Sequence, residues 1–154
     1  MIGPMEILTS DQNSKNYLLT NKDQVQVLLF ENYVPAGFPS PAETYTEGPL
    51  NLHDYLVKKP AATFFVRVTG DSMVGAGIFK GDLLVVDKSL EPAHRSIVIA
   101  AVDGEFTVKR LIKRQGQILL QAENPNYPDR LIQEGNSFEI WGVVCHCIHD
   151  LRNT

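Results

Sequence analysis

Two side chains of this sequence could form a nucleophile and its base: Ser72 and Lys109. Ser72 lies in the segment GDSM at 70–73, and Lys109 lies in EFTVKRL at 105–111, a run typical of a buried strand. A serine hydroxyl is a weak nucleophile near neutral pH and needs a base to take its proton. Lysine can be that base only when it is neutral, and apolar burial lowers its pKa. The pair therefore predicts serine–lysine nucleophilic catalysis.

A bond for such a pair to cut lies upstream, in the segment VPAGFPSP at 34–41. Its three prolines keep the backbone extended and out of a helix. Proteases bind extended chain, so the small residues Ala36 and Gly37 within this segment are candidate substrate residues. The alternative is that 34–41 is a plain linker.

The residues alone leave a structural role for the pair open. Ser72 could simply cap a turn, and Lys109 could face solvent. The Ser-x-x-Lys signature is absent, and Val74 stands where the G-x-S-x-G elbow has its second glycine. Histidines could supply the base of a Ser-His-Asp triad, but none lies in a recognisable motif; they are His53, His94, His146 and His149.

Composition indicates one globular domain with an appendage. The chain has 154 residues, of which 44% are hydrophobic and 21% are charged, and a formal net charge of -4. An acidic chain gives no sign of a basic face, so direct nucleic-acid binding is not expected. No apolar run approaches the ~20 residues that span a bilayer, and the N-terminal residues do not resemble a secretory signal. We therefore expect a cytoplasmic protein without a membrane segment.

The two cysteines, Cys145 and Cys147, do not predict a disulfide or a metal site. Residues i and i+2 of a strand point to the same face about 7 Å apart, beyond ordinary disulfide reach. His146 and His149 are nearby, but a structural zinc site usually needs a second ligand pair at a recognisable spacing. We expect no metal and no cofactor, and we expect both thiols to be buried or half-buried in a strand.

The pattern of elements predicts a mainly β fold, a curled, partly closed antiparallel sheet. The one expected helix covers 50–57, before Pro60. Runs rich in Val, Ile, Leu and Phe predict six strands, at 63–68, 82–87, 96–102, 105–112, 117–122 and 138–148. Asp103 and Gly104 predict a tight hairpin between two of them. Residues 1–36 differ from the rest of the chain. The segment 9–16 is polar and has no amphipathic period, whereas 25–30 has strand character.

Three segments, 65–73, 81–87 and 97–111, together resemble the LexA-like self-cleaving serine peptidases, and the resemblance extends over about 33–152. It implies the fold of that family, with Ser72 as the nucleophile and Lys109 as the general base. It also implies that the scissile bond joins Ala36 to Gly37. The oxyanion hole would be formed by backbone N–H groups, here those of Asp71 and Ser72.

The same resemblance implies two parts, an N-terminal arm at 1–36 that self-cleavage removes and a peptidase domain at 37–154. Repressors of the family carry a helix-turn-helix domain before the cleavage site, and 36 residues are too few for one. This favours the SOS mutagenesis branch. Its members form homodimers, cleave themselves when RecA filament on single-stranded DNA stimulates them, and then join a UmuC-type subunit in an error-prone translesion DNA polymerase.

Three other functions remain open at this point. The chain could be a non-enzymatic β-rich binding module in which Ser72 and Lys109 are structural, or a LexA-like regulator without a DNA-binding domain. A signal-peptidase relative would share serine–lysine chemistry but should carry a membrane anchor.

Overall fold

The computed structural model describes residues 7–8, 27–30, 34–37 and 46–153. Contacts divide the chain into two compact units. The first comprises 1–10 and 59–154, and the second comprises 11–58. The leader segment 9–16 lies outside the described residues, as does the start of the expected strand at 25–30.

The first unit is built on one eight-stranded antiparallel sheet, in the order β1-β4-β5-β10-β6-β7-β8-β9. The sheet is open, with β1 and β9 at its two edges. Its strands are β1 (Ile7–Leu8), β4 (Thr63–Arg67), β5 (Leu83–Asp87), β6 (Ile97–Val102), β7 (Glu105–Arg114), β8 (Gln117–Gln121), β9 (Arg130–Ile132) and β10 (Phe138–Ile148). The mainly β, antiparallel prediction is confirmed, and all six expected strands are present.

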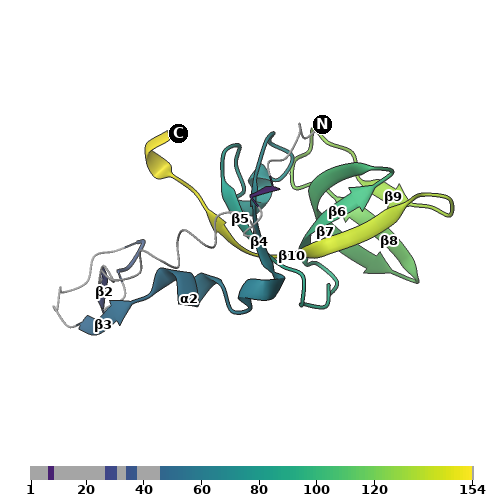
Figure 1. Ribbon diagram of the computed structural model, residues 1–154. Coiled ribbons are helices and arrows are strands. Elements are labelled where there is room, and N and C mark those ends of the chain that lie inside the picture. The colour runs from purple at the N-terminus through teal and green to yellow at the C-terminus, as the bar shows by residue number, and fades with distance from the viewer. Residues whose placement is uncertain (1–6, 9–26, 31–33, 38–45, 154) are drawn as a thin grey trace. The chain divides into compact units, whose positions relative to one another are not determined.

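Strand β10 joins the two halves of the sheet (Figure 1). Its first half pairs with β6 and its second half with β5, and the register shifts once within each pairing. Such bulges bend a strand and increase its twist. A Cβ at Gly142 would lie 2.7 Å from Cγ1 of Val86, so only glycine fits where β10 passes β5.

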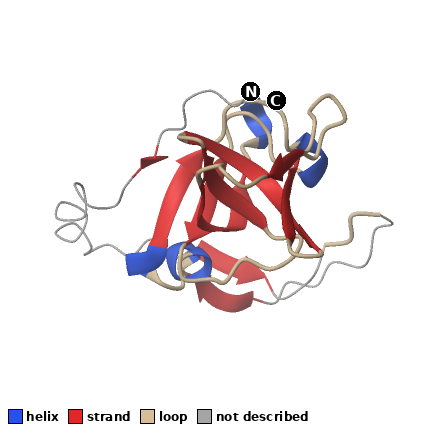
Figure 2. Ribbon diagram, turned by 90° about the vertical axis from the view of Figure 1, so that its right-hand side faces the viewer, coloured by secondary structure: helices blue, strands red, loops and turns tan. Residues whose placement is uncertain are grey.

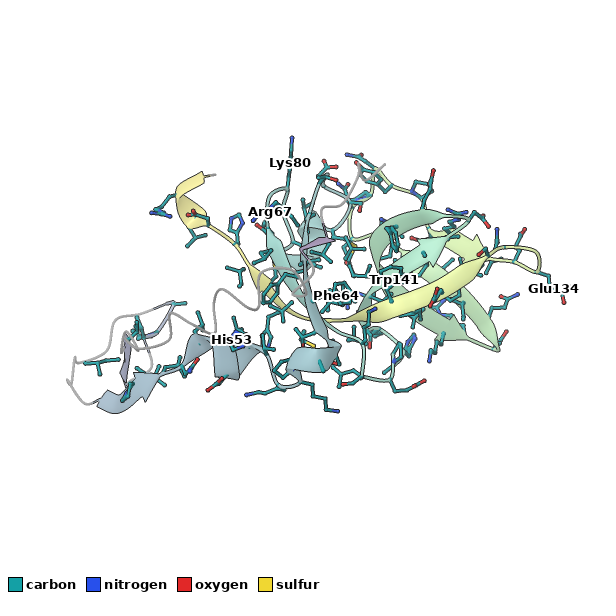
Figure 3. The ribbon with its side chains drawn as sticks, viewed as in Figure 1. His53, Phe64, Arg67, Lys80, Glu134 and Trp141 are labelled. Carbon is teal, nitrogen blue, oxygen red and sulfur yellow. The ribbon has the colours of Figure 1, made fainter. Side chains whose placement is uncertain are left out.

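Among the described residues, two clusters of buried hydrophobic side chains form the core of the first unit. Strand β4 shows how the sequence builds them, because buried Phe64 and Val66 alternate with more exposed neighbours. The first cluster also takes in Met73 and Ile78, which follow the Ser72 turn. Aromatic rings pack edge-on at its margin, with Trp141 6.5 Å from Phe64 between ring centroids (Figure 3). The second cluster is formed mainly by β6, β7 and β8. The Ser72 turn and β7 are therefore both fixed by packed side chains.

Helical structure in the described residues is confined to short pieces (Figure 2). They are α2 (Leu52–Leu56) and three 3₁₀ turns, η1 (Pro60–Ala62), η2 (Val74–Ala76) and η3 (Leu151–Asn153). The expected helix at 50–57 is thus real but shorter. Its N-cap is Asn51, whose side chain accepts a hydrogen bond from the Asp54 N–H at 3.1 Å. None of these helices is both long enough and apolar enough to cross a membrane.

In the second unit, β2 (Val27–Phe30) pairs antiparallel with β3 (Thr46–Leu50). The strand character of 25–30 is therefore confirmed for its described residues. Strand β3 was not expected, because its Gly48 and Pro49 are both depleted in strands. Strands β1 and β9 were also not expected, and they have only two and three residues.

Candidate active site

Ser72 lies in a tight turn that follows β4. The turn contains Gly70 at φ +91° and leads directly into the 3₁₀ turn η2, in which the Ala76 N–H donates a hydrogen bond to the Met73 carbonyl at 3.0 Å. Ser72 itself is only 2% exposed, and Met73 next to it is 1% exposed. The turn therefore holds the hydroxyl inside the protein, away from bulk water.

Lys109 lies on β7 and reaches the Ser72 hydroxyl. Its Nζ is 2.9 Å from Ser72 Oγ, 2.9 Å from Thr107 Oγ1 and 3.1 Å from the Val108 carbonyl oxygen. Thr107 and Lys109 are two residues apart on one strand, so their side chains share a face of the sheet. The structure thus brings together the two residues that the sequence paired, and it adds Thr107. Strand alternation could have identified Thr107 from the sequence.

Burial lowers the pKa of Lys109 to about 8. Within the described part of the chain, Nζ has hydroxyl and carbonyl partners and no carboxylate that would favour the charged form. Near pH 8 about half of the molecules therefore carry a neutral amine. Its lone pair can then accept a hydrogen bond from the Ser72 hydroxyl, which is the arrangement that a general base requires.

A loop at 122–127 is hydrogen-bonded to the Ser72 turn. The Glu123 N–H donates to the Ser72 carbonyl at 2.9 Å, and the Gly75 N–H donates to the Glu123 carbonyl at 2.7 Å. A Cβ at Gly75 would lie 2.6 Å from that carbonyl oxygen, so glycine is needed for this approach. The Glu123 carboxylate also forms an ion pair with Arg110 of β7. Sequence analysis missed this loop, because no local pattern connects 122–127 to 70–76.

The expected oxyanion donors are the backbone N–H groups of Asp71 and Ser72. In the described residues neither group donates a hydrogen bond to another part of the protein. Their use as oxyanion donors stays a prediction. Ala36 and Gly37 are exposed and lie in a bend of the second unit. Their approach to Ser72, and the boundary at 36/37, also stay predictions.

No histidine replaces Lys109 as the base, because in the described residues Lys109 is the one titratable side chain hydrogen-bonded to Ser72 Oγ. His149 instead has its Nδ1 2.5 Å from Oδ1 of the buried Asp82. His94 accepts a hydrogen bond from the Lys113 N–H at 3.1 Å.

The prediction of buried or half-buried thiols is wrong, because Cys145 and Cys147 are both exposed. They lie in the second half of β10, which pairs with β5 alone beyond the bulge at Val144/His146. Although Cys147 is exposed as a residue, its Sγ is partly desolvated and donates a hydrogen bond to Asp82, and both effects raise the pKa of Cys147 to about 12, so its thiol is not activated. Among the residues that the structure describes, no group of three or more His, Cys, Asp or Glu side chains could hold a metal ion.

Comparison with known proteins identifies relatives over most of the chain. The Peptidase S24-like family matches residues 28–145. Protein SamA of Salmonella typhimurium is 52% identical over 126 residues, which cover 82% of this chain and 87% of SamA. Protein MucA of Salmonella typhimurium is 50% identical over 116 residues, covering 75% and 79% of the two chains. Protein ImpA of Salmonella typhimurium is 47% identical over 129 residues, covering 80% and 84%.

Proposed function

This chain belongs to the Peptidase S24-like family, and from that premise we propose that it is a UmuD-like SOS mutagenesis protein that cuts its own chain between Ala36 and Gly37. The observation that carries the proposal is the 2.9 Å contact between Lys109 Nζ and Ser72 Oγ. A pKa of about 8 for Lys109 supports it, because a lysine base must lose its proton near working pH.

The reaction begins when neutral Lys109 takes the hydroxyl proton of Ser72, and Oγ attacks the carbonyl carbon of Ala36. The oxyanion of the tetrahedral intermediate accepts hydrogen bonds from backbone N–H groups at Asp71 and Ser72. Protonated Lys109 then gives its proton to the Gly37 nitrogen, and the peptide bond breaks. Lys109 then takes a proton from a water molecule, which attacks the remaining ester between Ser72 and Ala36, and it passes this proton to Ser72 Oγ as the ester bond breaks.

Cleavage divides the chain into an arm at 1–36 and a domain at 37–154. In the proposed function the protein is a cytoplasmic homodimer, and RecA filament on single-stranded DNA stimulates the cut. The trimmed domain then joins a UmuC-type polymerase subunit. The net charge of -4 fits an assembly in which the partners, and not this chain, contact DNA.

The arm acts in this scheme by covering a surface that the polymerase subunit selects. Its described strand β2 carries three exposed apolar residues, Val27, Leu28 and Leu29, which suit such a contact. The test compares intact Ser72→Ala protein with the fragment 37–154 in binding to a UmuC-type subunit and in amide hydrogen exchange. We expect tighter binding and faster exchange in part of the fragment. Equal affinity together with identical exchange would exclude the arm as a switch.

The proposed stimulation by RecA is tested on the full chain. Wild type should be cut faster with RecA filament than without it, and Ser72→Ala should stay intact in both conditions. Cleavage of the Ser72→Ala chain at the same bond would mean that another nucleophile, or a contaminating protease, is responsible.

A further inference from the structure

The side chain of Asn124 makes two hydrogen bonds of different kinds. Its Nδ2 donates to the Asp71 carbonyl at 2.9 Å, across 53 positions of sequence. Its Oδ1 accepts from the Asn126 N–H at 3.0 Å, which closes a turn inside the 122–127 loop. The second bond shapes the loop. The first reaches out of the loop to the residue before the nucleophile.

The Asp71 carbonyl and the Ser72 N–H belong to the same peptide group. That group is planar, and no peptide bond among the described residues is cis, so its C=O and N–H point in opposite directions. Whatever fixes the carbonyl therefore fixes the N–H. The alternative donor to this carbonyl is the Val74 N–H, at 3.4 Å and thus beyond the usual range. Asn124 is the closer of the two donors.

We propose that Asn124 is a positioning residue for the reaction: by holding the Asp71 carbonyl, it aims the Ser72 N–H at the developing oxyanion. The inference rests on the proposed self-cleavage. A hydrogen bond accepted by the carbonyl also polarises the peptide and strengthens its N–H as a donor. Asn124 touches neither the substrate nor the reacting atoms, and it acts only through the Asp71–Ser72 peptide.

The rest of the loop holds the groups on either side of that peptide. The Glu123 N–H holds the Ser72 carbonyl, which belongs to the next peptide. The Tyr127 hydroxyl donates to Asp71 Oδ1 at 2.5 Å, and this hydrogen bond raises the pKa of Tyr127, so the phenol remains a donor. The loop therefore hydrogen-bonds to the backbone carbonyls of both Asp71 and Ser72. Within the loop, Asn124 is the residue that holds the peptide group to which the Ser72 N–H belongs.

Two variants separate positioning from loop structure. Asn124→Asp has nearly the same shape and keeps an oxygen for the Asn126 N–H, but it has no N–H to donate to the Asp71 carbonyl. Asn124→Leu is also of similar shape, is uncharged, and loses both hydrogen bonds. Tyr127→Phe is the matched control, since it removes one hydroxyl from the same loop and leaves the Asn124 bond in place.

We expect both Asn124 variants to self-cleave about 10- to 100-fold more slowly than wild type at the pH where the rate is maximal. Tyr127→Phe should lose less. In a Lys109→Ala background, which prevents cleavage, the ¹⁵N amide resonance of Ser72 should move in Asn124→Asp. That of Phe79, which donates to Asp82, should stay in place.

Full-rate cleavage by Asn124→Asp, with a slow Asn124→Leu, would overturn the assignment, because the loop turn and not the donated hydrogen bond would then matter. An unmoved Ser72 resonance would overturn it as well. A wild-type chain that stays intact, alone and with RecA filament, would instead overturn the proposed function itself.

Discussion

Lys109 Nζ lies 2.9 Å from Ser72 Oγ although β7, which carries Lys109, and β4, which precedes the Ser72 turn, are not neighbours in the sheet. Strand β5, strand β10 and strand β6 separate β4 from β7, and four strand spacings in a flat sheet would amount to about 19 Å. The contact is possible because Ser72 lies beyond the end of β4, in a turn, and because the bulges in β10 bend the strand that joins the two halves of the sheet. The position of Ser72 relative to Lys109 therefore depends on all the strands from β4 to β7 in the sheet order.

Thr107→Val should alter the pH dependence of self-cleavage. Thr107 Oγ1 accepts a hydrogen bond from Lys109 Nζ, and valine has the same shape without the acceptor. An ammonium group loses more than a neutral amine when an acceptor is removed, so the pKa of Lys109 should fall further and the midpoint of the rate profile should move below about 8. A pH–rate profile measures this shift. A midpoint that moves upward would show that Thr107 does not stabilise the charged form.

Lys109→Met should change how stability depends on pH. The pKa of Lys109 is about 8 in the folded chain, and a free lysine has a pKa near 10.4. Below pH 8 the folded protein buries a charged ammonium group, which lowers its free energy of unfolding. Between these two values the unfolded chain binds more protons, so the stability of the lysine protein rises with pH.

At pH 7 we expect Lys109→Met to have a higher free energy of unfolding than its parent, because it buries no charge. This difference should shrink by about 2–3 kcal/mol from pH 7 to pH 10.5, as the folded parent's lysine becomes neutral. Urea unfolding in a Ser72→Ala background, where no cleavage interferes, measures the difference. A difference that stays constant over this range would mean that Lys109 keeps an ordinary pKa in the folded protein.

Gly75→Ala should damage both the fold and the reaction. The added methyl group would meet the Glu123 carbonyl oxygen at 2.6 Å, which pushes the 122–127 loop away from the Ser72 turn. We expect a loss of about 1–3 kcal/mol in the free energy of unfolding, measured in urea, together with slower self-cleavage. Unchanged stability and rate would mean that this close approach is not needed in solution.

Bulky side chains at the substrate segment should block cleavage without unfolding the domain. Ala36 and Gly37 are small and exposed, and the backbone must come close to Ser72 Oγ for attack. Ala36→Trp and Gly37→Glu should each stop the cut while the chain keeps the unfolding temperature and the oligomeric state of wild type. Intact-mass spectrometry and light scattering check the two points. Cleavage between 36 and 37 in either variant would show that the reaction does not need small side chains at these two positions.

Sequence pattern predicted the parts of the site that depend on local order. Strand β7 and its Lys109 follow from a run of apolar residues, and the Ser72 turn follows from its Gly-Asp composition. The 122–127 loop could not be found in this way, since its hydrogen bonds to Asp71 and Ser72 join segments about fifty positions apart. The exposure of Cys145 was missed because it depends on tertiary pairing: Cys145 lies at the bulge between Val144 and His146, in the part of β10 that pairs with β5 and not with β6.

The most direct test of the account is a time course of intact mass for the purified chain as pH is raised from 6 to 10. We expect fragments 1–36 and 37–154 to appear without any added protease, at a rate that rises with pH around a midpoint near 8, the pKa of Lys109. Lys109→Arg should give no fragments, because a guanidinium stays protonated over this range. Cleavage of Lys109→Arg between Ala36 and Gly37, or a wild-type rate independent of pH, would contradict a serine–lysine dyad.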